Sequence, residues 1–159
     1  MIEHSDLRFG IDAADRRAED VDPSPAGARA ALESFYYALN HANLAVLRAV
    51  WTDHPLAQLN NPVGGILRGG TAVADLYGRI FAGSMRLEIE FGDVVEYLGA
   101  GHAVFAGRET GHYGPARTPI SIRTTRYFRY VAGHWAQFHH HGSIDDADAL
   151  RAYQQAVRN

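Results

Sequence analysis

Three consecutive histidines, His139 to His141, stand in the last strand-like run of the chain, which extends from Trp135 to Ser143. Histidine can bind a metal or exchange a proton near neutral pH, because its unperturbed pKa is about 6.5. Side chains alternate between the faces of a strand, so His139 and His141 face one way and His140 the other. The triplet therefore predicts a pair of histidines roughly 7 Å apart on one face and a single histidine on the other.

A metal ion shared by His139 and His141 is one interpretation of that pair. The chain lacks the later glutamate and histidine of a cupin motif, so we expect no metal site and no bound cofactor. A second acid–base candidate is Asp93, which shares strand parity with Phe91 and could point inward as a base. A bulge at Gly92 would turn it outward, and the sequence leaves both orientations open.

The composition excludes several kinds of chemistry. Cysteine is absent, and all 15 residues counted as Lys or Arg are arginine. Disulfides, thiolate nucleophiles, Schiff-base lysines and a phosphate-binding P-loop are therefore excluded. A net charge of -3 without a basic cluster argues against nucleic acid, and no uncharged apolar run approaches the ~20 residues that span a bilayer. We expect a cytoplasmic protein whose partners are neither nucleic acids nor membranes.

Residues 1–22 form an acidic N-terminal extension with seven acidic residues and three arginines. This extension has few large apolar residues and ends at Pro23-Ser24-Pro25, so we expect it to be mobile or loosely docked. The rest of the chain, 23–159, is long and apolar enough to fold as a single domain.

The periodicity of apolar residues changes once along that domain. Helical stripes and the Ser24-Pro25 start signal predict three helices, which begin near residues 25, 44 and 71. From Met85 the period becomes two, which predicts strands near 85–91, 102–113, 120–130 and 135–143, joined as an antiparallel meander. A closing helix carries Tyr153 on its apolar side. This order predicts an α+β fold, with helices packed on one curved, mainly antiparallel sheet.

Four phrases in this order resemble the nuclear transport factor two-like superfamily: Phe35–Asn40, Asn61–Gly64, Gly69–Val73 and Trp135–Ser143. The chain is similar to SnoaL-like and ketosteroid isomerase-like members, and to the association (hub) domain of calcium/calmodulin-dependent kinases. The resemblance implies a cone-shaped half-barrel, with a pocket between the concave sheet face and the helices. It also implies a homodimer formed through the outer sheet face.

Each relative implies a different use of the pocket. Ketosteroid isomerases place a catalytic acid where this chain has Asn61, and an amide cannot take up that proton, so their activity is not expected. The hub domain implies that Arg108 and Arg126 line the pocket and hold an anion, unless a glutamate pairs with them. Two further hub positions, Gly142 and Val73, lack that domain's arginine and histidine.

The register of the last strand also follows from the resemblance. It points Phe138, His140 and Gly142 inward, and Trp135, Gln137, His139 and His141 outward. His140 then lies at or near the position of an acid–base aspartate of polyketide cyclases, and an imidazole could transfer a proton in the same way.

We therefore expect a SnoaL-like protein that binds a small polar or carboxylate-bearing molecule. It could be a cofactor-independent isomerase, cyclase or dehydratase, with His140 and Asp93 as catalytic candidates. The ligand-binding candidates are Arg108, Arg126, Tyr36, Tyr77, Trp51, Asn61 and Phe138, although the helical stripes also fit Tyr36, Tyr77 and Trp51 as core residues. The alternative is a non-catalytic binding or oligomerisation module that resembles the hub domain and works through its outer sheet face.

Overall fold

The predicted helices are present in the computed structural model, which describes residues 1–158. They are α1 (Pro25–Asn40), α2 (Leu44–Val50), α3 (Gly70–Ala82) and the closing α4 (Ala147–Arg158). Ser24 caps α1 by accepting a hydrogen bond from the backbone N–H of Ala26, and Pro25 occupies the first turn, where a missing N–H costs little. Each of the first three helices therefore begins where the sequence predicted.

Within the described residues, seven strands form one sheet in the order β1-β4-β5-β6-β7-β2-β3. Their bounds are β1 (Ile2–Ser5), β2 (Gln58–Asn60), β3 (Leu67–Arg68), β4 (Leu87–Gly99), β5 (His102–Tyr113), β6 (Thr118–Val131) and β7 (His134–Ser143). All neighbouring strands are antiparallel except β2 and β7, which run parallel. The sheet is not closed, and the predicted α+β class with a cone-like shape is confirmed.

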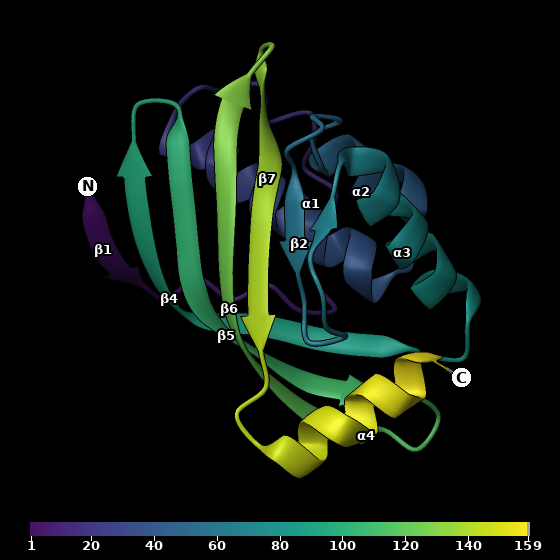
Figure 1. The fold of residues 1–159 in the computed structure, drawn as a ribbon. Coiled ribbons are helices and arrows are strands. Elements are labelled where there is room, and N and C mark those ends of the chain that lie inside the picture. The colour runs from purple at the N-terminus through teal and green to yellow at the C-terminus, as the bar shows by residue number, and fades with distance from the viewer. Residues whose placement is uncertain (159) are drawn as a thin grey trace.

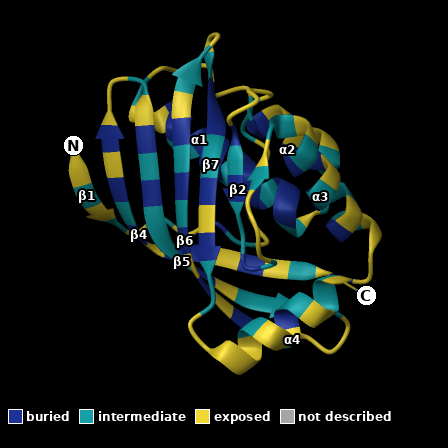
Figure 2. Cartoon of the chain, viewed as in Figure 1, coloured by how far each residue is buried: buried dark blue, intermediate teal, exposed yellow. Residues whose placement is uncertain are grey.

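The long strands bend, and helices cover only their concave side (Figure 1). The core lies between this side and α1 to α3, where Leu32, Phe35, Phe91, Phe105 and Phe128 are fully buried. Helix α4 crosses the lower end of the bent strands, and most of its surface is exposed (Figure 2). The bend thus creates an interior that α4 closes at one end.

Residues 1–22 are docked on the sheet. Strand β1 pairs with β4, and Phe9 forms a bridge with Phe91 and is 9% exposed. The indole N–H of Trp135 donates to the backbone oxygen of Asp22, and Arg16 pairs with Glu33 on α1. The expectation of a mobile or loosely docked segment was wrong, because these contacts compensate for its lack of large apolar residues.

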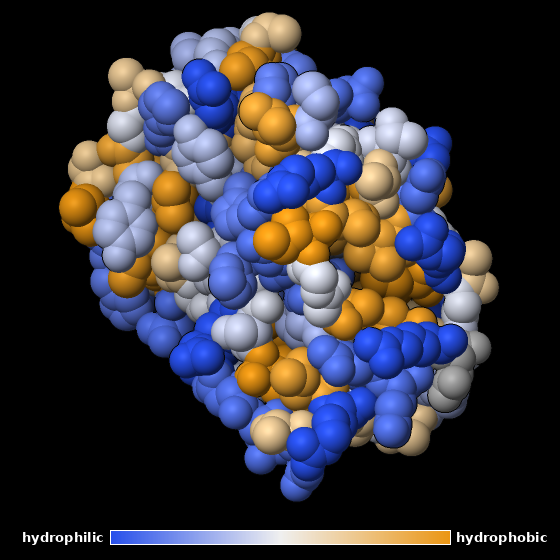
Figure 3. Space-filling view, viewed as in Figure 1, coloured by the Kyte–Doolittle hydropathy of each residue, from blue (hydrophilic) through white to orange (hydrophobic). Residues whose placement is uncertain are grey.

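The surface is mixed in polarity. On the face shown in Figure 3, apolar patches are separated by hydrophilic residues. Within residues 1–158, no helix is both long and apolar enough to cross a membrane.

Candidate functional site

Arg126 lies at the centre of the interior, on the concave face of β6, and is 1% exposed. Its Nη2 donates to Glu109 Oε1 at 2.7 Å, and its Nε donates to the hydroxyl of Tyr36 at 2.9 Å. That hydroxyl donates in turn to Glu109 Oε1 at 2.7 Å. The guanidinium carbon also lies 3.6 Å from the ring centroid of Phe35, a cation–π contact. Arg126 points inward as predicted, but it is already paired.

Burial by itself would lower the pKa of Arg126, but Tyr36 and Glu109 raise it above its ordinary value. The arginine is therefore permanently charged. Its charge is balanced by the carboxylate of Glu109, which is also buried, at 3% exposed. The centre of the site is thus an ion pair without net charge.

Glu109 is the inward carboxylate that sequence reasoning missed, because we assigned β5 the opposite facing. Arg108 was predicted to line the pocket, but it lies on the outer face. There its Nη1 donates to Ser121 Oγ at 2.9 Å and lies 3.7 Å from Asp145 Oδ2. The sequence did contain evidence for the correct facing of β5. Phe105 and Tyr113 share strand parity with Glu109, and large apolar residues indicate the buried face of a strand.

His140 points inward from β7, as the family resemblance implied, and is 3% exposed. It lies directly beside Arg126, its register partner on the adjacent strand β6. Neither of its ring nitrogens has a hydrogen-bond partner among the described residues. Burial, and then the charge of Arg126, lower the pKa of His140 well below its ordinary value, so the imidazole is neutral.

A bulge in β7 changes the facing of the residues before His140. Tyr127 pairs with His139 and Phe128 pairs with Gln137, so Phe138 has no partner on β6. Gln137 is consequently fully buried, and its Oε1 accepts a hydrogen bond from Arg126 Nη1 at 3.4 Å. The outward prediction for Gln137 was wrong, as was the same prediction for Trp135, which is 1% exposed.

Phe138 was predicted to bind ligand, but the bulge turns it away from the interior, where it packs near His54 and Arg129. The outward facing of the other two histidines agrees with the prediction. His141 is exposed, and His139 is half-buried, with its Nδ1 3.1 Å from the backbone oxygen of Gln58. No cluster of three or more metal-binding side chains occurs within residues 1–158.

A cavity of about 40 Å³ lies beside the ion pair. Its polar lining comes from Asn61, Tyr77, Glu109, Arg126, His140 and Tyr153, and its apolar lining from Leu39, Pro62, Ile80, Leu87, Ile89, Ile120 and Ile122. Two predicted residues, Asn61 and Tyr77, are thus brought to the site, and burial raises the pKa of Tyr77 to about 12. The polar side chains converge on one small volume, which makes this the candidate site.

Two other predicted residues lie elsewhere. Asp93 sits at the β4 bulge with φ of 52°, and its exposed carboxylate lies 3.1 Å from His4 Nε2, so the outward alternative is correct. Trp51 is buried at the end of α2 and lines a separate surface hollow with Arg48 and Thr71. Neither residue contributes to the cavity.

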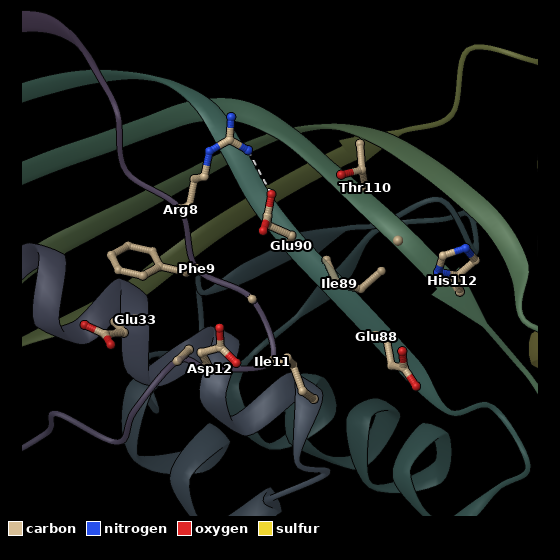
Figure 4. A pocket seen from close by; sticks show the side chains of 13 residues that line it. Arg8, Phe9, Ile11, Asp12, Glu33, Glu88, Ile89, Glu90, Thr110 and His112 are labelled. Carbon is tan, nitrogen blue, oxygen red and sulfur yellow. Dashed lines mark hydrogen bonds and ion pairs between the residues drawn. The ribbon is translucent and has the colours of Figure 1, made fainter.

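A larger hollow of about 580 Å³ lies between residues 8–13 and strands β4 and β5 (Figure 4). Its lining includes Glu33, Glu88 and Glu90. Each of these glutamates is paired with an arginine, namely Arg16, Arg117 and Arg8, at distances of 3.1, 2.7 and 2.8 Å. This hollow therefore lacks the unpartnered, buried polar groups that distinguish the cavity.

The family model of the SnoaL-like domain matches residues 28–147. The chain belongs to the SnoaL-like family. The match spans α1 through β7 and therefore includes Arg126, Glu109 and His140. No curated protein matches the chain.

Solved structures similar to this SnoaL-like protein share its fold. One is a provisionally assigned calcium/calmodulin-dependent protein kinase type II association domain from Thiobacillus denitrificans ATCC 25259. It is 26% identical with a TM-score of 0.63, and the match covers 78% of this chain and 97% of that one. A provisionally assigned dehydratase of the NTF2-like family from Streptomyces avermitilis is 23% identical with a TM-score of 0.65, over 80% and 98% of the two chains. A ketosteroid isomerase-like protein from Erwinia carotovora atroseptica SCRI1043 is 21% identical with a TM-score of 0.62, over 74% and 93%.

Proposed function

We propose that this SnoaL-like protein binds a small polar organic molecule in the cavity and transfers a proton on it without a cofactor. The observation that carries the proposal is His140, whose ring lines the cavity while both nitrogens lack partners. A buried polar atom without a partner costs about 1–3 kcal/mol, and a ligand that bonds to the ring would remove that cost. The site is thus more stable when it is occupied.

The charges of the lining favour a neutral ligand over an anion. Arg126 is engaged by Glu109, and His140 is neutral because burial lowers its pKa. A carboxylate would have to compete with Glu109 for the guanidinium. We therefore propose a molecule with an apolar body and a carbonyl or hydroxyl group. Seven apolar side chains would contact the body, and His140 would bond to the polar group.

Glu109 and His140 together could move a proton. Oε1 of Glu109 accepts the hydrogen bonds from Tyr36 and Arg126, so Oε2 is left to act as a base. It would take a proton from the carbon next to the ligand's carbonyl, and the electron pair of that C–H bond would form an enolate. The N–H of neutral His140 would donate to the enolate oxygen. In a β,γ-unsaturated ketone the electron pair is delocalised over the neighbouring C=C bond, so Glu109 would return the proton to the γ carbon and leave the α,β-unsaturated ketone. The result is an isomerisation that needs no external reactant.

We expect C4–C6 ketones or enones to raise the melting temperature of the wild type by about 5–10 °C at 100 times their dissociation constant. His140→Phe keeps the ring volume and removes both nitrogens, so its melting temperature should not rise. Thermal denaturation of both proteins with the same panel tests this, and matched carboxylates test the preference for neutral ligands. Equal stabilisation of His140→Phe would contradict the assignment of the site.

The chemical step has its own measurement. In D₂O, the wild type should exchange the C–H hydrogens next to the carbonyl of a bound ketone, which NMR detects. Glu109→Gln should slow the exchange by about a hundredfold or more. Asp75→Asn, which changes an exposed carboxylate on α3 in the same way, is the matched control and should exchange at the wild-type rate. If the wild type binds the ketone but does not exchange its hydrogens, the protein binds small molecules without catalysis, and the proposed proton transfer is refuted.

We also propose a homodimer through the outer sheet face. The helices α1 to α3 leave this face open (Figure 1), and one similar structure is described as an association domain. Thr125 and His141 pair across β6 and β7 in the middle of the face. Thr125→Arg should convert the dimer to a monomer in sedimentation velocity, because the new charge meets a second copy. Asp75→Arg, on the exposed side of α3, should remain dimeric, and a monomeric wild type would refute the dimer.

A further inference from the structure

Helix α4 contributes one buried side chain to the body of the protein, and Ala156 and Val157 pack partly buried beside it. Tyr153 is 5% exposed and is the one fully buried residue between Ala147 and Arg158. Its ring meets Tyr113 edge-to-face, with centroids 5.3 Å apart. The rest of the helix is mostly exposed at the lower end of the sheet (Figure 2). Elements with so few buried contacts open at low free-energy cost.

The same tyrosine forms part of the cavity wall. The loop between β2 and β3 contributes Asn61 and Pro62 to the lining, and Gln154 Nε2 donates to the backbone oxygen of Pro62 at 2.9 Å. This hydrogen bond ties α4 to the loop. The other walls come from α1, α3 and the long strands, which are held by the core and by ladder hydrogen bonds. Tyr153 therefore belongs to the part of the cavity lining that is held in place by the fewest buried interactions.

The start of α4 is held separately. Asp145, just before the helix, lies 2.6 Å from Arg123 Nε and 3.7 Å from Arg108 Nη1 on the outer face. Such exposed ion pairs are weak, but the connection from β7 to α4 is only three residues long and keeps the N-terminal end of α4 in place while its far end moves. The cavity also requires such a motion, because about 40 Å³ holds only a few water molecules, whereas a C4–C6 molecule is larger.

We propose that Tyr153 is the gate of the cavity and sets the size of the molecule it admits. Helix α4 swings on its short connection to β7, Tyr153 leaves the wall, and the Gln154–Pro62 hydrogen bond re-forms when the helix closes. The need for opening rests on the proposed function, whereas the gate itself can be measured without any ligand.

The chain has no cysteine, so one introduced thiol gives an unambiguous readout. Ile122→Cys places it in the cavity lining, and Val94→Cys places it in the core away from the cavity. The probe is methyl methanethiosulfonate, a small neutral reagent, and mass spectrometry follows its attachment. Tyr153→Ala should speed labelling at position 122 by about tenfold or more, with a smaller change at position 94. Tyr153→Phe keeps the ring and should label at the parent rate.

Equal acceleration at positions 122 and 94 would mean that Tyr153→Ala merely destabilises the whole fold, which would overturn the gate. Fast labelling at position 122 that does not depend on Tyr153 would also overturn it, and would leave the ligand proposal intact. Conversely, labelling at position 122 could depend on Tyr153 as expected while no ketone or enone raises the melting temperature. That result would refute the proposed function and leave the gate intact. Gln154→Ala should speed labelling by a smaller factor than Tyr153→Ala, because the ring still fills the wall.

Discussion

Replacing Arg126 with leucine is expected to lower the free energy of unfolding by about 3–5 kcal/mol. The substitution leaves the carboxylate of Glu109 buried without its cation, and Tyr36 and Gln137 lose their hydrogen bonds to the guanidinium. Urea unfolding, followed by circular dichroism, measures the loss. This is the largest single effect we expect, because an uncompensated buried charge is far more costly than a lost surface ion pair.

Two further variants separate charge from packing. Arg108→Leu removes a half-exposed arginine on the neighbouring strand and should cost about 0–1 kcal/mol. The triple variant with Arg126→Met, Glu109→Leu and Tyr36→Phe removes the network together and should recover most of the stability. A triple variant as unstable as Arg126→Leu would show that volume, and not the unpaired charge, causes the loss.

Stability should also fall as the pH drops below about 6.5, by up to about 1.4 kcal/mol per pH unit from His140 alone. Burial and Arg126 lower the pKa of His140 in the folded protein, while the unfolded chain keeps the ordinary value. Between the two pKa values the unfolded state binds the extra proton, so acid favours unfolding. The contribution is complete above pH 6.5 and is lost as the pH falls toward the folded pKa.

His140→Gln removes this group and should flatten the pH dependence over the same range. His141→Gln changes the exposed neighbour and should keep the wild-type slope, which controls for the other histidines. Urea unfolding at pH 5, 6, 7 and 8 compares the three proteins. A wild-type slope that survives in His140→Gln would place the responsible titration elsewhere.

The sequence predicted the α+β class, the three early helices, the meander and the inward facing of Arg126 and His140. The class, the helices and the meander follow from periodicity and from local start signals, which need no tertiary information. The inward facing of Arg126 and His140 was implied by the family resemblance. The facing of Arg108, Phe138, Gln137 and Trp135 was wrong for two separate reasons. For Trp135, Gln137 and Phe138, the β7 bulge shifts the facing by one residue, and a bulge has no strong local signal. Arg108 lies in a regular stretch of β5, and its facing was wrong because the resemblance assigned it against the parity of Phe105 and Tyr113.

The N-terminal segment shows a second limit of sequence reasoning. Its composition is typical of a mobile tail, yet Phe9 finds a place beside Phe91, and the backbone of Asp22 accepts the indole N–H of Trp135. Both partners lie far along the chain. Composition reports how much apolar surface a segment carries, but not whether the folded domain provides a place for it.

The bulge at Phe138 also determines how this site should be sought in other sequences. Gln137 and His140 flank Arg126 on the same face although they are three residues apart, whereas a regular strand would need an even separation. A search for histidines in alternating positions would therefore select His139 and His141, which lie outside. The pattern to search for is a glutamine followed three residues later by a histidine in the last strand. An arginine should pair with that histidine on the neighbouring strand, and a glutamate should lie on the strand before the one with the arginine.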